Sequence, residues 1–144
     1  MNRNDDLLQL EDVFKQVSKK LSMLWHRTGI KISGSHARIL AQLDREGPQK
    51  TSDLAKMLGM TAGGVTGLAD KLIAEGLATR RRAENDRRIV YLEITDKGKD
   101  MLTHVREQRE KMKAAIIDGL TDKELHHMLL VYKKILQNIE DALK

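Results

Sequence analysis

Apolar residues recur every three or four positions along most of the chain, the pattern of amphipathic helices. Near the N-terminus, from about residue 5 to residue 28, the apolar positions are Leu7, Leu10, Phe14, Val17, Leu21 and Leu24. After residue 121 they are Leu125, Leu129, Tyr132, Leu136, Ile139 and Leu143. Both spacings alternate between three and four, which predicts two long helices, each with an apolar seam for packing against other helices.

Capping residues divide the rest of the helical pattern. Ser33 is expected to cap a second helix that stops at Gly47-Pro48, with His36 helping the cap. Another long helix is expected to start at Thr95 and to break at Gly119. Thr121-Asp122-Lys123-Glu124 has the form of a capping box and predicts the start of the last helix.

The middle of the chain, residues 50–76, predicts two shorter helices. Thr51 is expected to cap a helix over residues 52–58, and Gly59 to end it in a left-handed conformation. Thr61 then caps a second helix that Gly76 closes, and its apolar positions are Val65, Leu68, Leu72 and Ile73. Two short helices joined by a tight glycine-containing turn are typical of a helix-turn-helix, whose second helix enters the major groove of DNA.

Two strands are predicted next, over residues 77–82 and 88–94, and the second alternates between two faces. The polar tip between them covers residues 83–87, and residues 49–50 are expected to add a third short strand. From Arg80 to Arg88 there are five arginines against two acidic residues, a local charge of +3. A cationic hairpin beside a groove-reading helix is a winged helix-turn-helix. The predicted fold class is therefore mainly α (α+β), with a winged core over residues 30–98, its helix-turn-helix at about 51–75 and its wing at 77–94.

The hairpin and the following helix carry a recognisable motif. Asp86-Arg87-Arg88, Ile94-Thr95 and Gly98 match the pattern D-x-R…L-T-x-x-G, with Ile in place of Leu. With the segment from Val65 to Leu72 and with Glu75-Gly76-Leu77, the chain resembles the MarR family of bacterial transcription regulators over nearly its whole length. The resemblance implies one domain over residues 1–144, and a homodimer held together by residues 5–28 and 96–143. Its target would be a pseudo-palindromic double-stranded DNA operator with half-sites about one helical turn apart.

The start of the recognition helix would approach the bases. Its residues there are Thr61, Ala62, Gly63, Gly64 and Thr66, followed by Gly67. None is an Arg, Asn or Gln, the side chains that make bidentate contacts with bases, and the Arg that many relatives carry near Gly67 is absent. Thr and Ala can still touch a thymine methyl group, and free amides at the helix start can hold a phosphate. Close approach to DNA is one interpretation of the glycines, and close internal packing of Gly67 is another.

The wing is the stronger candidate for affinity. By the family resemblance, Arg88 or its neighbour Arg87 enters the minor groove, and Asp86 forms an ion pair that orients the hairpin. A narrow minor groove has an enhanced negative potential that attracts such an arginine. Arg80, Arg81 and Arg82 would be phosphate ligands, with Arg81 favoured. The alternative is a solvated basic hairpin that binds no ligand.

Composition narrows the classes of function. The 144 residues carry a net charge of +5, which favours a polyanionic partner, and four dispersed aromatic residues argue against an RNA-stacking surface. Since there is no cysteine, disulfides, thiolate zinc sites and thiol-based oxidant sensing are excluded. No apolar run is long enough to span a membrane and no signal peptide is recognisable, so we expect a cytoplasmic protein. Without any catalytic, cofactor or metal-binding motif, an enzyme is not expected.

Regulation is predicted from the resemblance alone. Similar proteins often respond to small aromatic or phenolic ligands that bind between the helical layer and the winged module. Trp25 and Arg27, at the end of the first helix, are candidates to receive an aromatic anion, while the alternative is that Trp25 belongs to the core. The predicted function is a transcription regulator that represses and is released by a ligand or other signal. The alternatives are a weakly specific architectural DNA-binding protein and a winged-helix module that binds protein.

Overall fold

The computed structural model describes residues 2–144. In chain order, its elements are α1 (Arg3–Arg27), α2 (Gly34–Glu46), β1 (Gln49–Lys50), α3 (Thr51–Leu58), α4 (Ala62–Ala74), β2 (Ala78–Arg82), β3 (Val90–Ile94), α5 (Asp96–Ile117) and α6 (Asp122–Ala142). The predicted fold class, mainly helical with a three-stranded wing sheet, is confirmed. The backbone forms two compact units, Met1–Arg109 and Glu110–Lys144, and α5 begins in the first and ends in the second.

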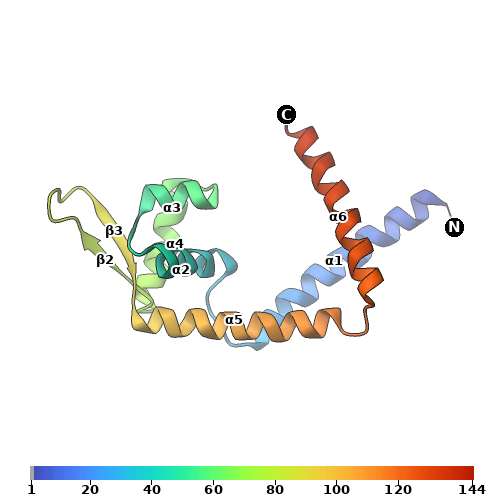
Figure 1. The fold of residues 1–144 in the computed structure, drawn as a ribbon, viewed down its shortest axis with the longest axis horizontal. Helices are drawn as coiled ribbons and strands as arrows, with labels where there is room; N and C mark the ends of the chain where they lie inside the picture. Colours follow the sequence, from blue (N-terminus) through green and yellow to red (C-terminus); the bar gives the residue numbers. More distant parts are fainter. Residues whose placement is uncertain (1) are drawn as a thin grey trace. The chain divides into compact units, whose positions relative to one another are not determined.

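The first unit is organised around α2, α3 and α4, which gather beside the β2–β3 hairpin (Figure 1). Its largest fully buried side chains come from these helices, from the residue directly before β2 and from α5: Ile39, Leu40, Leu43, Leu54, Val65, Leu72, Leu77 and Val105. The apolar periodicity of the sequence therefore marks the core-facing side of each helix correctly. This core fixes the places of the helix-turn-helix and the base of the wing.

Three of the four predicted caps are confirmed, and one is wrong. Ser33 caps α2 together with His36, whose Nδ1 accepts from the Ser33 backbone N–H at 3.0 Å. Thr61 caps α4 and Thr121 caps α6. Thr51, however, is the first helical residue of α3, and the N-cap is Lys50, which makes no side-chain cap bond. The reason is that Lys50 already lies in β1, so its extended backbone runs directly into the helix.

The strands form an antiparallel sheet in the order β1-β3-β2. The register pairs Arg80 with Leu92 and Arg82 with Val90, which puts these residues on the same face of the sheet. Leu92 is buried, so this face is the one directed at the helices. The predicted third strand at residues 49–50 is confirmed, and the two hairpin strands are one or two residues shorter at their first ends than predicted.

A tight joint connects the end of α4, the start of β2 and the start of α5. The Thr95 amide donates to the Leu77 carbonyl at 3.1 Å, and the Thr95 hydroxyl donates to the Gly76 carbonyl at 2.7 Å. At Gly98 an added Cβ would stand 2.1 Å from the Leu77 carbonyl oxygen, which no side chain permits. The T-x-x-G part of the motif therefore has a structural cause: the threonine binds the carbonyls that follow α4, and the glycine lets α5 approach them.

The helices nearest the two termini have no fully buried side chain, and on α1 Trp25 packs only partly against the core. On α1, Leu10 is 64% exposed and Phe14 59% exposed. On α6, Leu136 is 55% exposed and Ile139 53% exposed. The predicted apolar seams are thus present on both helices, and each is open in the single chain.

Candidate nucleic-acid interface

The outer face of α4 carries only small side chains over its first two turns. Val65, Ala69 and Leu72 are buried and hold the helix on the core. The exposed positions of these turns are Ala62, Gly63, Thr66 and Gly67. Because the Thr66 hydroxyl donates to the Ala62 carbonyl at 2.9 Å, even this polar side chain is engaged with its own helix. The exposed face therefore presents backbone and methyl groups, and it has no long hydrogen-bonding side chain that would keep a bound molecule at a distance from the helix.

The glycines of α4 differ in what surrounds them. A Cβ at Gly63 or Gly67 would meet no atom of the described chain within 4 Å, so the interpretation that Gly67 is needed for internal packing is wrong. A Cβ at Gly64 would lie 2.9 Å from the Met60 methyl group and 3.3 Å from the Thr61 hydroxyl oxygen. That hydroxyl accepts from the Gly64 amide at 3.1 Å, so Gly64 leaves room for the cap. Only Gly63 and Gly67 therefore lack an explanation within the fold.

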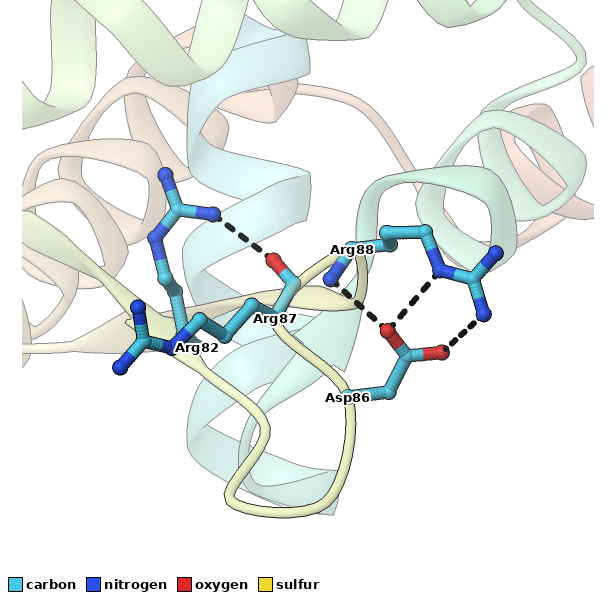
Figure 2. Close-up of polar contacts among 4 residues, drawn as sticks. All are labelled: Arg82, Asp86, Arg87 and Arg88. Atoms are coloured by element: carbon cyan, nitrogen blue, oxygen red, sulfur yellow. Dashed lines mark hydrogen bonds and ion pairs between the residues drawn. The ribbon is translucent and has the colours of Figure 1, made fainter.

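The hairpin tip is held by Asp86, as the family resemblance predicted. Its carboxylate accepts from the Arg88 backbone N–H at 3.0 Å, and from the Arg88 Nε and Nη2 at 3.1 Å each (Figure 2). These hydrogen bonds lower the pKa of the Asp86 carboxyl below its ordinary value of 3.8. The Arg88 side chain is nevertheless 90% exposed. Asp86 thus orients the guanidinium without covering it.

A second contact fixes the other side of the tip. The Arg82 Nη1 donates to the Arg87 carbonyl at 2.7 Å, so the side chain of one strand binds the backbone of the turn (Figure 2). The backbone closes the turn as well, since Ala83 donates to Ile89 at 3.0 Å and Ile89 donates to Asp86 at 3.1 Å. Arg87 itself remains exposed. Two exposed guanidinium groups are thereby presented on a turn whose shape is fixed.

The three consecutive arginines of β2 do not share one face. Arg80 and Arg82 lie on the face that carries buried Leu92, whereas Arg81 lies on the opposite face, 3.7 Å from the Glu93 carboxylate. Arg80 is ion-paired with Asp70 of α4. The choice of Arg81 as a phosphate ligand stays a prediction, and its position away from α4 gives it no support.

A basic groove beside the wing was missed from the sequence. It has a volume of about 290 Å³, lies where α3 begins, and is lined by Lys50, Thr51, Ser52, Arg88, Ile89 and the first residue of β3, Val90. Because α3 has no side-chain cap, the first amides of the helix are free to bind an anion. The signal available in the sequence was Lys50 directly before the helix, but assigning the cap to Thr51 obscured it.

Comparison with known proteins agrees with this geometry. The model of the MarR family matches residues 32–90, which contain α2, the helix-turn-helix and the wing up to the start of β3. The uncharacterized HTH-type transcriptional regulator YpoP of Bacillus subtilis is 29% identical over 126 residues, which are 88% of this chain and 87% of that protein. The chain belongs to the MarR family. It is accordingly a DNA-binding transcription regulator and not an enzyme.

Two further similar proteins match nearly the whole chain. The HTH-type transcriptional repressor MdtR of Bacillus subtilis is 26% identical over 137 residues, 95% of this chain and 87% of that protein. The crystal structure of the YusO protein from Bacillus subtilis superposes with a TM-score of 0.73 at 25% identity, covering 93% of this chain and 94% of that one. The likeness therefore includes the terminal helices as well as the winged core.

The candidate ligand residues of this MarR-family chain lie in different surroundings. Trp25 packs partly against the core, and its indole N–H donates to the Ile32 carbonyl at 3.4 Å, which favours the interpretation that it belongs to the core. Arg27 is exposed in the last turn of α1. A pocket that uses both residues stays a prediction.

Other classes of site find no support in residues 2–144. No group of three or more His, Asp or Glu residues in this range could hold a metal ion. No helix in the same range is both long and apolar enough to cross a membrane. His36, the one buried histidine of the described chain, is accounted for by its cap on α2.

Proposed function

We propose that this protein is a homodimeric transcriptional repressor that binds a pseudo-palindromic operator through its wing and recognition helix. The observation that carries the proposal is the Asp86-oriented Arg88, presented on a fixed turn beside a helix with a bare outer face. An exposed guanidinium on a fixed turn suits insertion into a narrow minor groove. A helix without bulky side chains suits close approach to the floor of the major groove.

The phosphate backbone would be held by basic groups around these two elements. The groove between α3 and β3 combines the side chains of Lys50 and Arg88 with free helix amides, and an oxygen of a DNA phosphate fits this set of donors. Arg87 adds a further exposed cation on the same hairpin. We assign affinity chiefly to these contacts, since such interactions do not depend on base sequence.

Dimerisation is supported by the open apolar faces of α1 and α6. Contiguous exposed apolar side chains on long helices mark interaction surfaces. A second copy of the chain is the occupant, because two-fold symmetry presents two recognition helices to one face of the duplex. The half-sites should then lie about one helical turn apart, that is, roughly 10 base pairs between their centres.

Repression and its release are the finer parts of the proposal. The relative MdtR is named a repressor, and occupancy of a promoter by a dimer is sufficient to repress. A small aromatic anion near Trp25 and Arg27 would release the operator if it bound one dimer geometry better than the other. Quenching of the single tryptophan by salicylate would support that ligand class, and no change at millimolar salicylate would remove it.

Selection of genomic DNA fragments by the purified protein at physiological salt tests the function. The expected result is an inverted repeat with half-sites about one turn apart, upstream of the regulated genes. An alternative, a weakly specific architectural DNA-binding protein, is favoured by one observation: the outer face of the first turns of α4 has no long hydrogen-bonding side chain. Broad recovery with a steep salt dependence would select that alternative. No recovery even at low salt would indicate a protein-binding module.

A further inference from the structure

An ion pair joins the recognition helix to the wing. Arg80 of β2 donates through Nη2 to the Oδ1 of Asp70 on α4. Among residues 2–144, it is the ion pair that connects α4 with the sheet. The Asp70 side chain is 59% exposed and that of Arg80 48% exposed, so the pair lies at the surface.

Asp70 lies on the side of α4 that faces away from the core. It follows Gly67 by three positions and Gly63 by seven, which places the three residues on one helix face. If that face approaches DNA, an unpaired carboxylate there would be repelled by the phosphates. We therefore expect Asp70 to have a function that outweighs this repulsion.

The space between α4 and the sheet suggests what that role is. A cleft of about 270 Å³ opens there, lined by residues of α3, α4, β2 and β3 that include Thr66, Arg80 and Arg82. At the base of the hairpin, by contrast, Leu77 and Ala78 are buried. Side-chain packing thus fixes the base of the wing, but it does not fill the space farther along β2. The Asp70–Arg80 pair bridges the two elements at this unfilled level.

We propose that Asp70 is a positioning residue of the DNA interface, which holds Arg80, and with it strand β2, at a fixed place relative to the recognition helix. The inference rests on the DNA-binding role proposed above. It predicts an effect of unusual sign: removing a negative charge from a DNA-facing surface ordinarily strengthens binding, whereas removing Asp70 should weaken it.

Titration of the dimer with its selected operator duplex gives the first test. Asp70→Ala should weaken binding about fivefold or more, the scale of a well-formed surface ion pair. The matched controls Glu75→Ala and Glu84→Ala remove exposed acids that have no ion pair in the described chain, and they should leave affinity unchanged or raise it. Asp70→Glu should retain most of the affinity, and Asp70→Ala should have little further effect once Arg80→Ala is present. Tighter binding by Asp70→Ala would overturn the proposal.

Two further readouts separate positioning from other roles. If Asp70 instead reads a cytosine amino group, Asp70→Ala will relax the preference at one base pair while Arg80→Ala will not, which would overturn positioning. Hydrogen exchange of the free protein needs no DNA: amides of β2 and β3 should exchange faster in Asp70→Ala, with α2 unchanged. A wild-type protein that binds no duplex would refute the proposed function, while unchanged exchange of the β2 and β3 amides in Asp70→Ala would refute the positioning role of Asp70.

Discussion

The recognition helix and the wing are built in opposite ways. α4 is anchored by buried Val65 and Leu72, and the outer face of its first turns carries almost no functional groups. The hairpin has no buried residue between Arg81 and Val90, yet its own hydrogen bonds orient the guanidinium groups of Arg82 and Arg88. In most helix-turn-helix proteins the second helix supplies the base-reading side chains. In this protein, the exposed arginines of the wing are available to provide affinity for DNA. The bare face of α4 is available to approach the bases closely and so to discriminate between sequences.

The largest effect on stability is expected at the joint that connects the recognition helix with the wing. Gly98→Ala would put a methyl group against the Leu77 carbonyl, between the end of α4 and the start of β2. The backbone must shift, so we expect a loss of about 3 kcal/mol or more in the free energy of unfolding. Urea denaturation measures it. The matched control, Gly63→Ala, meets open space and should stabilise α4 by up to about 1 kcal/mol. Similar stabilities for the two variants would contradict the role assigned to the joint.

Arg88→Ala tests the wing half of the comparison. Loss of one well-placed arginine in each subunit should weaken operator binding by roughly 100-fold, about tenfold per subunit. The slope of log affinity against log salt should fall by about 2, because two cationic contacts are lost per dimer. Both quantities come from fluorescence titrations at several salt concentrations.

The control for the wing is Lys134→Ala on α6, which removes one exposed positive charge far along the chain from the helix-turn-helix. Its affinity and salt slope should equal those of the wild type. Should Arg88→Ala and Lys134→Ala bind the operator equally well, the wing would have no special part in recognition. The charge of the whole molecule would then account for affinity.

Gly67→Arg tests the helix half of the comparison. Since a side chain at Gly67 meets open space, the substitution should fold without strain. An arginine there can bind a guanine in the major groove through two hydrogen bonds, which are worth about 1–3 kcal/mol of discrimination. We expect about tenfold tighter binding to the best guanine-containing duplexes and a new base preference in a selection experiment.

Gly67→Lys provides the matched control, because lysine adds the same charge without the forked donor geometry. It should raise affinity for all duplexes alike. If Gly67→Arg also tightens binding without any new preference, the outer face of α4 does not approach base edges. The bare helix would then have no role in discrimination.

Most of this fold follows from the sequence, for identifiable reasons. Periodicity marked the buried positions of α2 and α4, and Ser33, Thr61 and Thr121 were correct caps because each precedes a regular apolar pattern. The cap at Thr51 failed because β1 and α3 are directly adjacent, so a strand residue occupies the cap position. Alternation could divide the arginines of β2 between two faces but could not tell which face carries Arg81, because that depends on the packing of Leu92.

The site was less predictable than the fold. The motif indicated that Asp86 forms an ion pair, but its partner and the three bonds to Arg88 follow from the shape of the turn. The groove at Lys50 and the pair of Asp70 with Arg80 both join residues from different elements. Contacts of this kind depend on tertiary packing, which a local pattern does not encode.

The smallest effect concerns mild acid, and it should separate the helical scaffold from the wing. Burial and the positive charge of Lys71 lower the pKa of His36 below its ordinary value of 6.5, so the folded protein holds this histidine neutral, with Nδ1 accepting from Ser33. The unfolded chain binds the proton more readily than the folded protein does. The contribution of neutral His36 to the free energy of unfolding is therefore fully present above pH 6.5, and it decreases as the pH falls below 6.5 toward the lowered pKa. Melting temperatures between pH 7.5 and 5.5 should therefore show a small decrease that His36→Gln abolishes, because glutamine retains the capping box without titrating. His104→Gln, which changes an exposed histidine on α5, should keep the decrease. The hairpin should be unaffected over this range, because hydrogen bonds from Arg88 keep the pKa of Asp86 below its ordinary 3.8. An equal acid response in the wild type and in His36→Gln would remove His36 as its source.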